Sequence, residues 1–321
     1  MWISPYKYYK YILSLGHLCS DINQSILSAV LPFLIATYHY DYTTAAMLVT
    51  VSNVFGAFVQ PFIGMLSDKK NKLLYMTLGV LLASGGMAVT GFISNFFGLC
   101  IVVIISGIGV VMFHPQAAKL VNSVSSKNAK GKGMSIFSFG GKVGFTLGPV
   151  YTAFLMNLFG MKGTILFLIP GIVFGIVCSF FNKDFENLDV LEVEKKEKVK
   201  SEQKDDWSGF IKLCCVVFSR SILSNGISTF LAFYFIQQFS KSNSFASMLL
   251  SVFYGIGSIT LLGGGIADCF GHRKMVRLSF CIFLPAIFIF TNTSHFVIAL
   301  IMLIFMTCGE SLSYSPMVVL G

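Results

Sequence analysis

Residues 64–72 read GMLSDKKNK, and residues 264–274 read GGIADCFGHRK. Each stretch ends a long apolar run with the pattern Gly-x-x-x-Asp and is followed at once by basic residues. The two glycines, Gly64 and Gly264, are separated by the same number of residues as the two aspartates, Asp68 and Asp268. A pattern that recurs at one offset indicates a duplicated unit, and its place at the ends of apolar runs points to the surface of a membrane.

The composition supports this interpretation. Hydrophobic residues make up 55% of the 321 residues, charged residues only 12%, and the mean hydropathy is +0.77. Because soluble proteins contain about 25% charged residues, the chain is predicted to be an integral membrane protein. The net charge of +9 does not indicate nucleic acid, since the basic residues are dispersed at the ends of apolar runs. The eight cysteines have no metal-ligand spacing, so no metal is expected.

Ten apolar runs are long enough to cross a bilayer, which takes about 20 helical residues. The fold class is therefore predicted to be all-α, a polytopic membrane protein, and the absence of alternating polarity excludes an outer-membrane barrel. The predicted helices cover residues 9–37, 44–67, 73–93, 96–120, 132–157, 163–181, 208–238, 245–266, 276–291 and 295–320. Phe113-His114-Pro115 is expected to close the fourth of these helices.

The distribution of Lys and Arg predicts the orientation. If the N-terminus is cytoplasmic, 19 of the 23 basic residues fall on the inner side, whereas only Lys162 and Lys241 fall in outer loops. Residues 182–207 mix acids and lysines and read as a charged cytoplasmic linker. The predicted organisation is an N-terminal six-helix bundle over 1–181, the linker, and a C-terminal bundle over 208–321 with four helices present.

The repeated motif resembles the signature loop between the second and third helices of each half in the major facilitator superfamily. The resemblance implies two six-helix bundles related by a parallel repeat, and a conformational latch on the cytoplasmic face. The latch residues would be Gly64, Asp68, Lys69, Lys72, Gly264, Asp268, Arg273 and Lys274. The glycines are expected to let helices approach closely, and the aspartates to accept hydrogen bonds from a helix N-terminus. By the repeat, two further helices are expected beyond Gly321.

Four ionisable residues fall roughly ten to fifteen residues inside apolar runs, near mid-depth in the bilayer by helical rise. They are Asp21, Lys142, Arg220 and Glu310. Buried charges in a membrane are costly and usually functional. Asp21 and then Glu310 are predicted to carry protons, and Lys142 and Arg220 to hold an anionic substrate. Structural pairing of these cations with the two carboxylates remains the alternative.

The first predicted helix carries His17, Asp21, Gln24 and Ser28 on one helical stripe. The stripe is expected either to face a water-filled cavity, with His17 tuning Asp21 and Gln24 contacting substrate, or to form a polar packing seam. His114 lies directly before a proline, and we expect either a gating or capping role or a role in proton transfer.

The fifth predicted helix carries Gly140, Gly144 and Gly148, followed by Pro149. The glycines form a stripe of small residues suited to close helix packing. The stretch resembles the G-x-x-x-G-P motif that the superfamily's exporters carry on this helix. Val150-Tyr151-Thr152 replace the glycines that would follow.

Four further stretches together resemble the fosmidomycin resistance family within the superfamily: LGHLCSDINQS, FHPQA, GGKVGFTLGP and SRSILSNGISTFLAFY. That family has a His-x-x-x-Asp-x-x-Gln run in its first helix, matched by His17, Asp21 and Gln24. It also has an Arg in its seventh helix, matched by Arg220. Two positions depart from its pattern: Gln116 replaces a Glu, and Lys142 replaces an uncharged polar residue. The resemblance implies a proton-driven inner-membrane exporter of a small anionic phosphonate antibiotic.

Other functions remain open. A symporter that imports a small organic anion is the alternative within transport, and a membrane receptor or sensor is the alternative of another class. An intramembrane enzyme would need a nucleophile beside a base, and no such motif is found, so no enzymatic activity is expected. The expected partners are a small-molecule substrate, protons and the lipid bilayer, with no cofactor and no nucleic acid. The protein is expected to be a monomer. No phosphate-binding loop is present that would indicate ATP as the energy source.

Overall fold

The computed structural model describes residues 8–66, 72–125, 130–181, 207–259 and 270–312. Its described residues are helical with no strand, which confirms the all-α fold class. The chain divides into two compact units, Met1–Lys200 and Ser201–Gly321. Seven helical stretches of the described part are long and apolar enough to cross a membrane.

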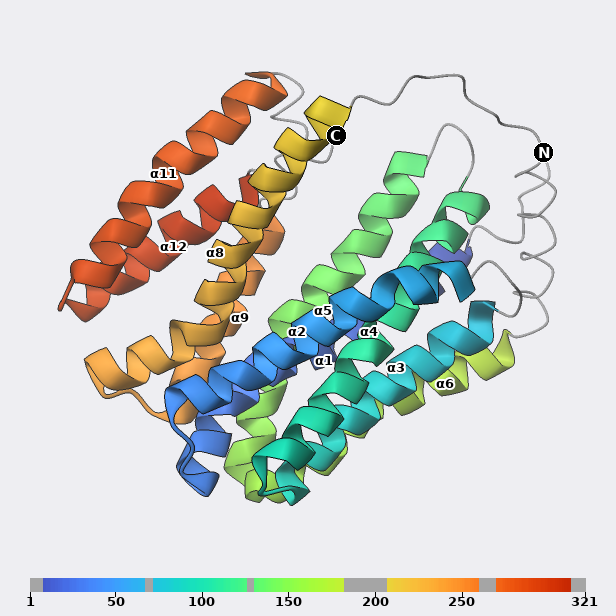
Figure 1. Cartoon of the computed structure of the whole chain (residues 1–321), viewed down its shortest axis with the longest axis horizontal. Helices are drawn as coiled ribbons and strands as arrows, with labels where there is room; N and C mark the ends of the chain where they lie inside the picture. The colour runs from blue at the N-terminus through green and yellow to red at the C-terminus, as the bar shows by residue number, and fades with distance from the viewer. Residues whose placement is uncertain (1–7, 67–71, 126–129, 182–206, 260–269, 313–321) are drawn as a thin grey trace. The chain divides into compact units, whose positions relative to one another are not determined.

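The first unit is a bundle of long helices that run side by side (Figure 1). Neighbouring pairs are α1 with α5, α3 with α4, α2 with α4, and α3 with α6. The elements are α1 (Tyr9–Tyr38), α2 (Tyr42–Leu66), α3 (Lys72–Val89), η2 (Thr90–Phe92), α4 (Phe96–Val124), α5 (Lys130–Phe159), η4 (Gly160–Leu168) and α6 (Ile169–Phe180).

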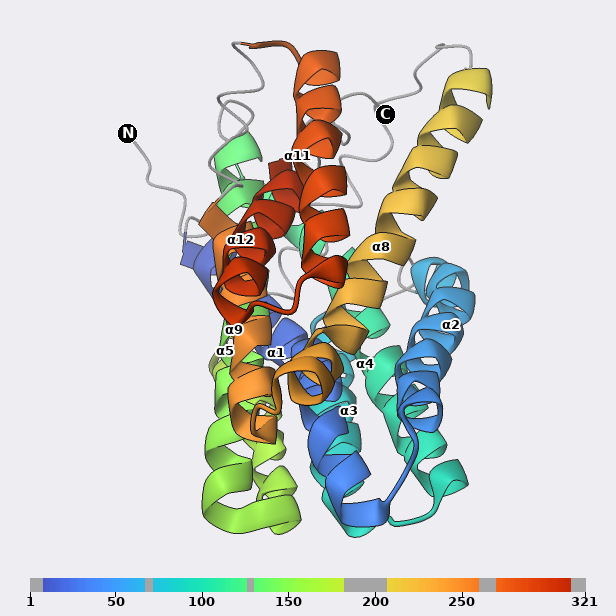
Figure 2. The same ribbon diagram turned by 90° about the vertical axis from the view of Figure 1, so that its left-hand side faces the viewer.

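The second unit contains α8 (Trp207–Phe239), α9 (Asn243–Ile259), α11 (His272–Asn292) and α12 (Phe296–Leu312). Helices α11 and α12 lie side by side in both views (Figures 1 and 2), and α9 packs against both α8 and α12. Gly309 allows the close approach of α11 and α12, because a Cβ there would lie 2.9 Å from backbone and Cβ atoms of Phe283. The ten predicted spans correspond to these helices, although residues 260–269 and 313–321 lie outside the described part.

Local signals explain where two helices of the first unit, α2 and α4, begin. The Asp41 carboxylate accepts a hydrogen bond from the Thr44 amide at 2.7 Å, and the Asn95 side chain accepts one from the Gly98 amide at 2.7 Å. Both residues thereby satisfy amides in the first turn of a helix, as N-caps do. The outer faces of the helices carry large exposed apolar side chains such as Phe97, 79% exposed, and Phe180, 80% exposed. An apolar exterior of this kind suits lipid rather than water.

Two boundaries differ from the prediction. Pro115 does not end its helix, because α4 continues to Val124 with the proline inside it. Membrane helices tolerate such a proline when neighbouring groups satisfy the backbone. The predicted α-helix at 163–181 begins instead as the 3-10 helix η4, which ends at Leu168. The Thr164 hydroxyl fixes this tighter segment, because it donates to the Ala88 carbonyl and accepts from the Gly91 amide.

Helices α1 and α5 approach each other along the glycine stripe predicted from the sequence. A Cβ at Gly140 would lie 2.1 Å from the Ser14 carbonyl oxygen, one at Gly144 2.5 Å from that of Leu18, and one at Gly148 2.0 Å from the Ser25 hydroxyl. Such distances leave no room for a side chain. At Gly64, by contrast, no described atom lies within 4 Å of the added Cβ, so the close approach expected there is not found among the described residues.

We expect Gly144→Ala to destabilise the protein by about 1–3 kcal/mol, because the new methyl group would force the α1 and α5 backbones apart. Gly85→Ala, on α3, is the matched control, since a Cβ there meets nothing within 4 Å. That change should be neutral or stabilising, as alanine favours helices over glycine. Thermal unfolding in detergent measures both, and equal stabilities for the two variants would contradict this account of the glycine stripe.

Candidate functional site

A buried polar site in the first unit is centred on Asp21, whose side chain is only 5% exposed. The His17 Nε2 atom lies 3.1 Å from Asp21 Oδ2, and the His114 Nε2 atom lies 2.9 Å from Asp21 Oδ1. We call His17, Asp21 and His114 the carboxylate–histidine cluster. It joins α1 to α4, because His17 and Asp21 lie one turn apart on α1 whereas His114 comes from α4.

The backbone and an aromatic ring orient both histidines. His17 Nδ1 lies 2.8 Å from the Phe137 carbonyl oxygen, and His114 Nδ1 lies 2.8 Å from the Val110 carbonyl oxygen. The Phe137 ring stacks on the His17 ring with centroids 4.0 Å apart. These contacts hold both Nε2 atoms toward Asp21.

Helix α5 closes the cluster from a third side. A Cβ added at Gly141 would lie 2.5 Å from Asp21 Oδ2 and 2.6 Å from His17 Nε2. Only a glycine fits at this position, so the α5 backbone itself covers the carboxylate. The sequence prediction did not include Gly141 or Phe137, although Phe137 and Gly141 are spaced four residues apart, beside the predicted glycine stripe.

Of the candidates that the sequence grouped around Asp21, the structure brings some into contact with its carboxylate and not others. His114, expected to serve either in gating or capping or in proton transfer, contacts Asp21 directly. Gln24 is exposed, whereas Asp21 and Ser28 are buried, so Gln24 does not join the cluster. The suggested pairing of Asp21 with Lys142 is not found in the described part, where the partners of Asp21 are the two histidines.

A second polar site lies within the second unit, where Arg220 on α8 forms an ion pair with Glu310 on α12. Both side chains are largely buried, with 16% and 11% exposed, and the Ser311 hydroxyl donates to Glu310 at 3.2 Å. The structural pairing considered for these two residues is therefore observed. An arginine stays charged under all ordinary conditions, so this pair can change only through the carboxylate or through another anion.

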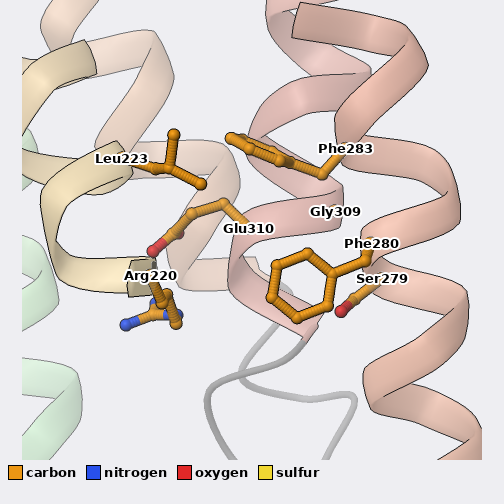
Figure 3. A pocket seen from close by; sticks show the side chains of 7 residues that line it. All are labelled: Arg220, Leu223, Ser279, Phe280, Phe283, Gly309 and Glu310. Atoms are coloured by element: carbon orange, nitrogen blue, oxygen red, sulfur yellow. Dashed lines mark hydrogen bonds and ion pairs between the residues drawn. The ribbon is translucent and has the colours of Figure 1, made fainter. Parts of the chain in front are cut away.

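The Arg220–Glu310 pair lines a small, partly open cavity (Figure 3). Its other lining residues are Leu223, Ser279, Phe280, Phe283 and Gly309. The cavity thus combines one ion pair and one hydroxyl with aliphatic and aromatic walls. Ligand sites typically have this composition, since a few polar groups orient a ligand that apolar walls surround.

Half of the latch residues lie outside the described part, namely Asp68, Lys69, Gly264 and Asp268. Lys72 begins α3, and Arg273 and Lys274 are exposed in the first turn of α11. The predicted site residues thus fall into two groups of described contacts, one around Asp21 and one around Arg220.

In the ion-pair site, Arg220→Gln or Glu310→Gln alone should cost about 3–5 kcal/mol of stability, because each leaves a largely buried charge without its partner. The double variant should cost clearly less than the sum of the single changes. Arg277→Gln serves as a control, since Arg277 is an exposed cation on α11. Chemical unfolding in detergent measures all four variants, and additive losses would show that the two charges do not stabilise each other.

Comparisons with known proteins agree with this architecture. The family model for the Major Facilitator Superfamily matches residues 13–321. The fosmidomycin resistance protein of Escherichia coli (strain K12) is 23% identical over 276 residues, which cover 82% of this chain and 66% of that protein. An uncharacterized MFS-type transporter, YfnC of Bacillus subtilis (strain 168), is 24% identical, with 83% and 66% covered. The chain thus spans slightly less than two thirds of the length of both relatives.

A solved structure shares the fold. The crystal structure of a bacterial homolog of the human lysosomal transporter Spinster, in an inward-facing and occupied conformation, superimposes with a TM-score of 0.78. The match covers 98% of this chain and 74% of that one at 16% sequence identity. At this identity the likeness concerns the fold alone.

Proposed function

Because the chain belongs to the Major Facilitator Superfamily, as its sequence motifs predicted, we propose that it is a proton-coupled exporter of a small organic anion. The observation that carries the proposal is the carboxylate–histidine cluster, a titratable site buried between α1 and α4. A carboxylate buried in a membrane bundle lowers stability, so its presence points to a function. Proton transfer is the function that suits the chemistry of a carboxylate. We place the N-terminus on the cytoplasmic side and propose that a monomer acts in the cell membrane.

Asp21 is the proposed coupling residue. Its carboxylate would take up a proton in one facing state of the transporter and release it in the other, while His17 and His114 tune that exchange. The Arg220 site supports an anionic substrate, because its guanidinium can hold a carboxylate or phosphonate through two parallel hydrogen bonds. Lys142 and Gln24 remain candidates for additional substrate contacts. The similarity to the fosmidomycin resistance protein suggests a phosphonate as the first substrate to test.

The ion pair favours one second candidate, a symporter that imports a small organic anion. A proton on Glu310 would release Arg220, so that a proton and an anion would bind together rather than compete. An antiporter requires the opposite relation between the two ligands. Adding fosmidomycin to the purified protein in weak buffer distinguishes the candidates, because proton release supports antiport and proton uptake supports symport.

Asp21→Asn should abolish transport driven by a pH gradient but spare substrate exchange, which needs no net proton movement. The matched control is Asp41→Asn, since Asp41 is an exposed residue that caps α2. Fosmidomycin flux into proteoliposomes, with and without a gradient, measures both activities. If Asp21→Asn keeps gradient-driven flux at the level of the parent, Asp21 is not the coupling residue.

The latch of Asp68 and Asp268 also remains a proposal. In Asp68→Asn and Asp268→Asn, we expect slower transport with unchanged substrate affinity, because the aspartates would stabilise one facing state rather than contact the ligand. Flux and equilibrium binding of fosmidomycin, measured on the same preparations, separate the two effects. Loss of binding with a normal transport rate per bound substrate would contradict the latch.

A further inference from the structure

The ring nitrogens of the two histidines define where hydrogen atoms must lie in the carboxylate–histidine cluster. His17 Nδ1 and His114 Nδ1 each lie 2.8 Å from a backbone carbonyl oxygen. A carbonyl oxygen can only accept a hydrogen bond. Both Nδ1 atoms therefore carry a hydrogen, whatever the charge of the rings.

The other two nitrogens face a carboxylate. In a neutral imidazole whose hydrogen is on Nδ1, the Nε2 atom is an acceptor with a lone pair. An ionised carboxylate is also only an acceptor, so the two would repel each other at the observed 2.9 and 3.1 Å. We call the spaces between each Nε2 atom and its Asp21 oxygen the two gaps. Each contact becomes favourable only when a proton lies in its gap, bonded to the nitrogen or to the oxygen.

We infer that the described structure is the loaded form of a two-proton site, with one proton between Asp21 and His17 and a second between Asp21 and His114. The inference rests on the proposed function, since it assigns the number of protons that this same site holds. Two neutral rings, one carboxylate and two added protons leave one net positive charge on the cluster. The chain would thereby bind two protons at a single aspartate.

The two protons differ in what they hold together. The gap between Asp21 and His17 lies within α1, whereas the gap between Asp21 and His114 spans α1 and α4. Losing the second proton leaves two acceptors facing each other across a helix contact, which weakens that contact. Only this proton therefore links the occupancy of the site to movement between the two helices.

Exposure identifies the path by which protons reach the site. The His114 side chain is 32% exposed, while that of Asp21 is 5% exposed and is covered by the α5 backbone at Gly141. Protons would then enter and leave through His114. The helices packed here also carry further ionisable side chains along their length, among them Lys119 on α4, Lys142 on α5, and the thiols of Cys19 on α1 and Cys178 on α6. None of these four is a partner of Asp21 among the described residues.

Nitrogen NMR of the full-length protein, labelled with ¹⁵N-histidine, tests this inference without substrate or gradient. The chain has five histidines, so His17→Gln and His114→Gln assign the two signals of interest. We expect both rings to keep the Nδ1 hydrogen at every pH and to gain an Nε2 proton over the same pH interval. His295→Gln is the control, since this residue lies in the loop before α12 and its loss should leave both signals unchanged.

Asp21→Asn gives the decisive count. An asparagine amide can donate one hydrogen bond and accept another, so one histidine should stay neutral and the variant should bind one proton fewer than the parent. If Asp21→Asn does not fold, the number of Nε2 protons that the two rings gain in the parent gives the count instead, and a count of one would overturn the inference. Independent histidines would still bind two protons in Asp21→Asn, and that result would overturn the inference, as would a neutral ring with its hydrogen on Nε2.

Metal analysis of the same samples tests whether a metal ion, rather than protons, occupies the cluster. One nitrogen of each histidine and one Asp21 oxygen lie within 4.8 Å of one another. A stoichiometric transition-metal ion in the purified parent would therefore replace the two protons and overturn the inference. Failure of the inference is distinguishable from failure of the proposed function. A count of two protons without gradient-driven transport would reject only the proposed function, whereas gradient-driven transport with a count of one would reject only this inference.

Discussion

The arrangement of the first unit depends on how a carboxylate is accommodated inside a bundle that faces lipid. An isolated ionised carboxylate is very costly in such surroundings. In this bundle the carboxylate of Asp21 contacts two histidines rather than a lysine or arginine. Unlike a lysine or arginine, a histidine can lose its charge by releasing a proton, so on the proposed function these partners of Asp21 would respond to protons. A permanent cation would have stabilised the carboxylate more firmly and would have removed its ability to respond.

The glycine stripe on α5 makes this accommodation possible. Close approach at Gly140, Gly144 and Gly148 brings the α5 backbone onto α1, and Gly141 then lies directly against the carboxylate. The same approach brings the Phe137 carbonyl to His17 Nδ1. A packing feature and a chemical feature therefore share one helix contact. A side chain at Gly140, Gly141, Gly144 or Gly148 would disturb both at once, which explains why these four positions are glycines.

The sequence predicts the helices and the depth of the charged residues, because apolar length and isolated charges are local properties. It does not predict which charges meet. Lys142 and Asp21 lie at similar depth, yet the partner of Asp21 is His114, which the proline beside it placed wrongly at a helix end. Side-chain direction decides such contacts, and it depends on how each helix is rotated in the bundle. The pairing of Arg220 with Glu310 could be proposed in advance only as one of two alternatives.

The two polar sites respond to different signals because their cations differ. Arg220 cannot lose its charge, so its pair with Glu310 opens only when the carboxylate is neutralised or when another anion takes its place. A histidine carries its charge only with a bound proton, so on the proposed function the cluster around Asp21 would open when protons leave. On the proposed function, the second unit would therefore respond to an anion and the first to protons. A transporter that couples the two needs both kinds of site, and on the proposed function each unit of this chain would supply one of them.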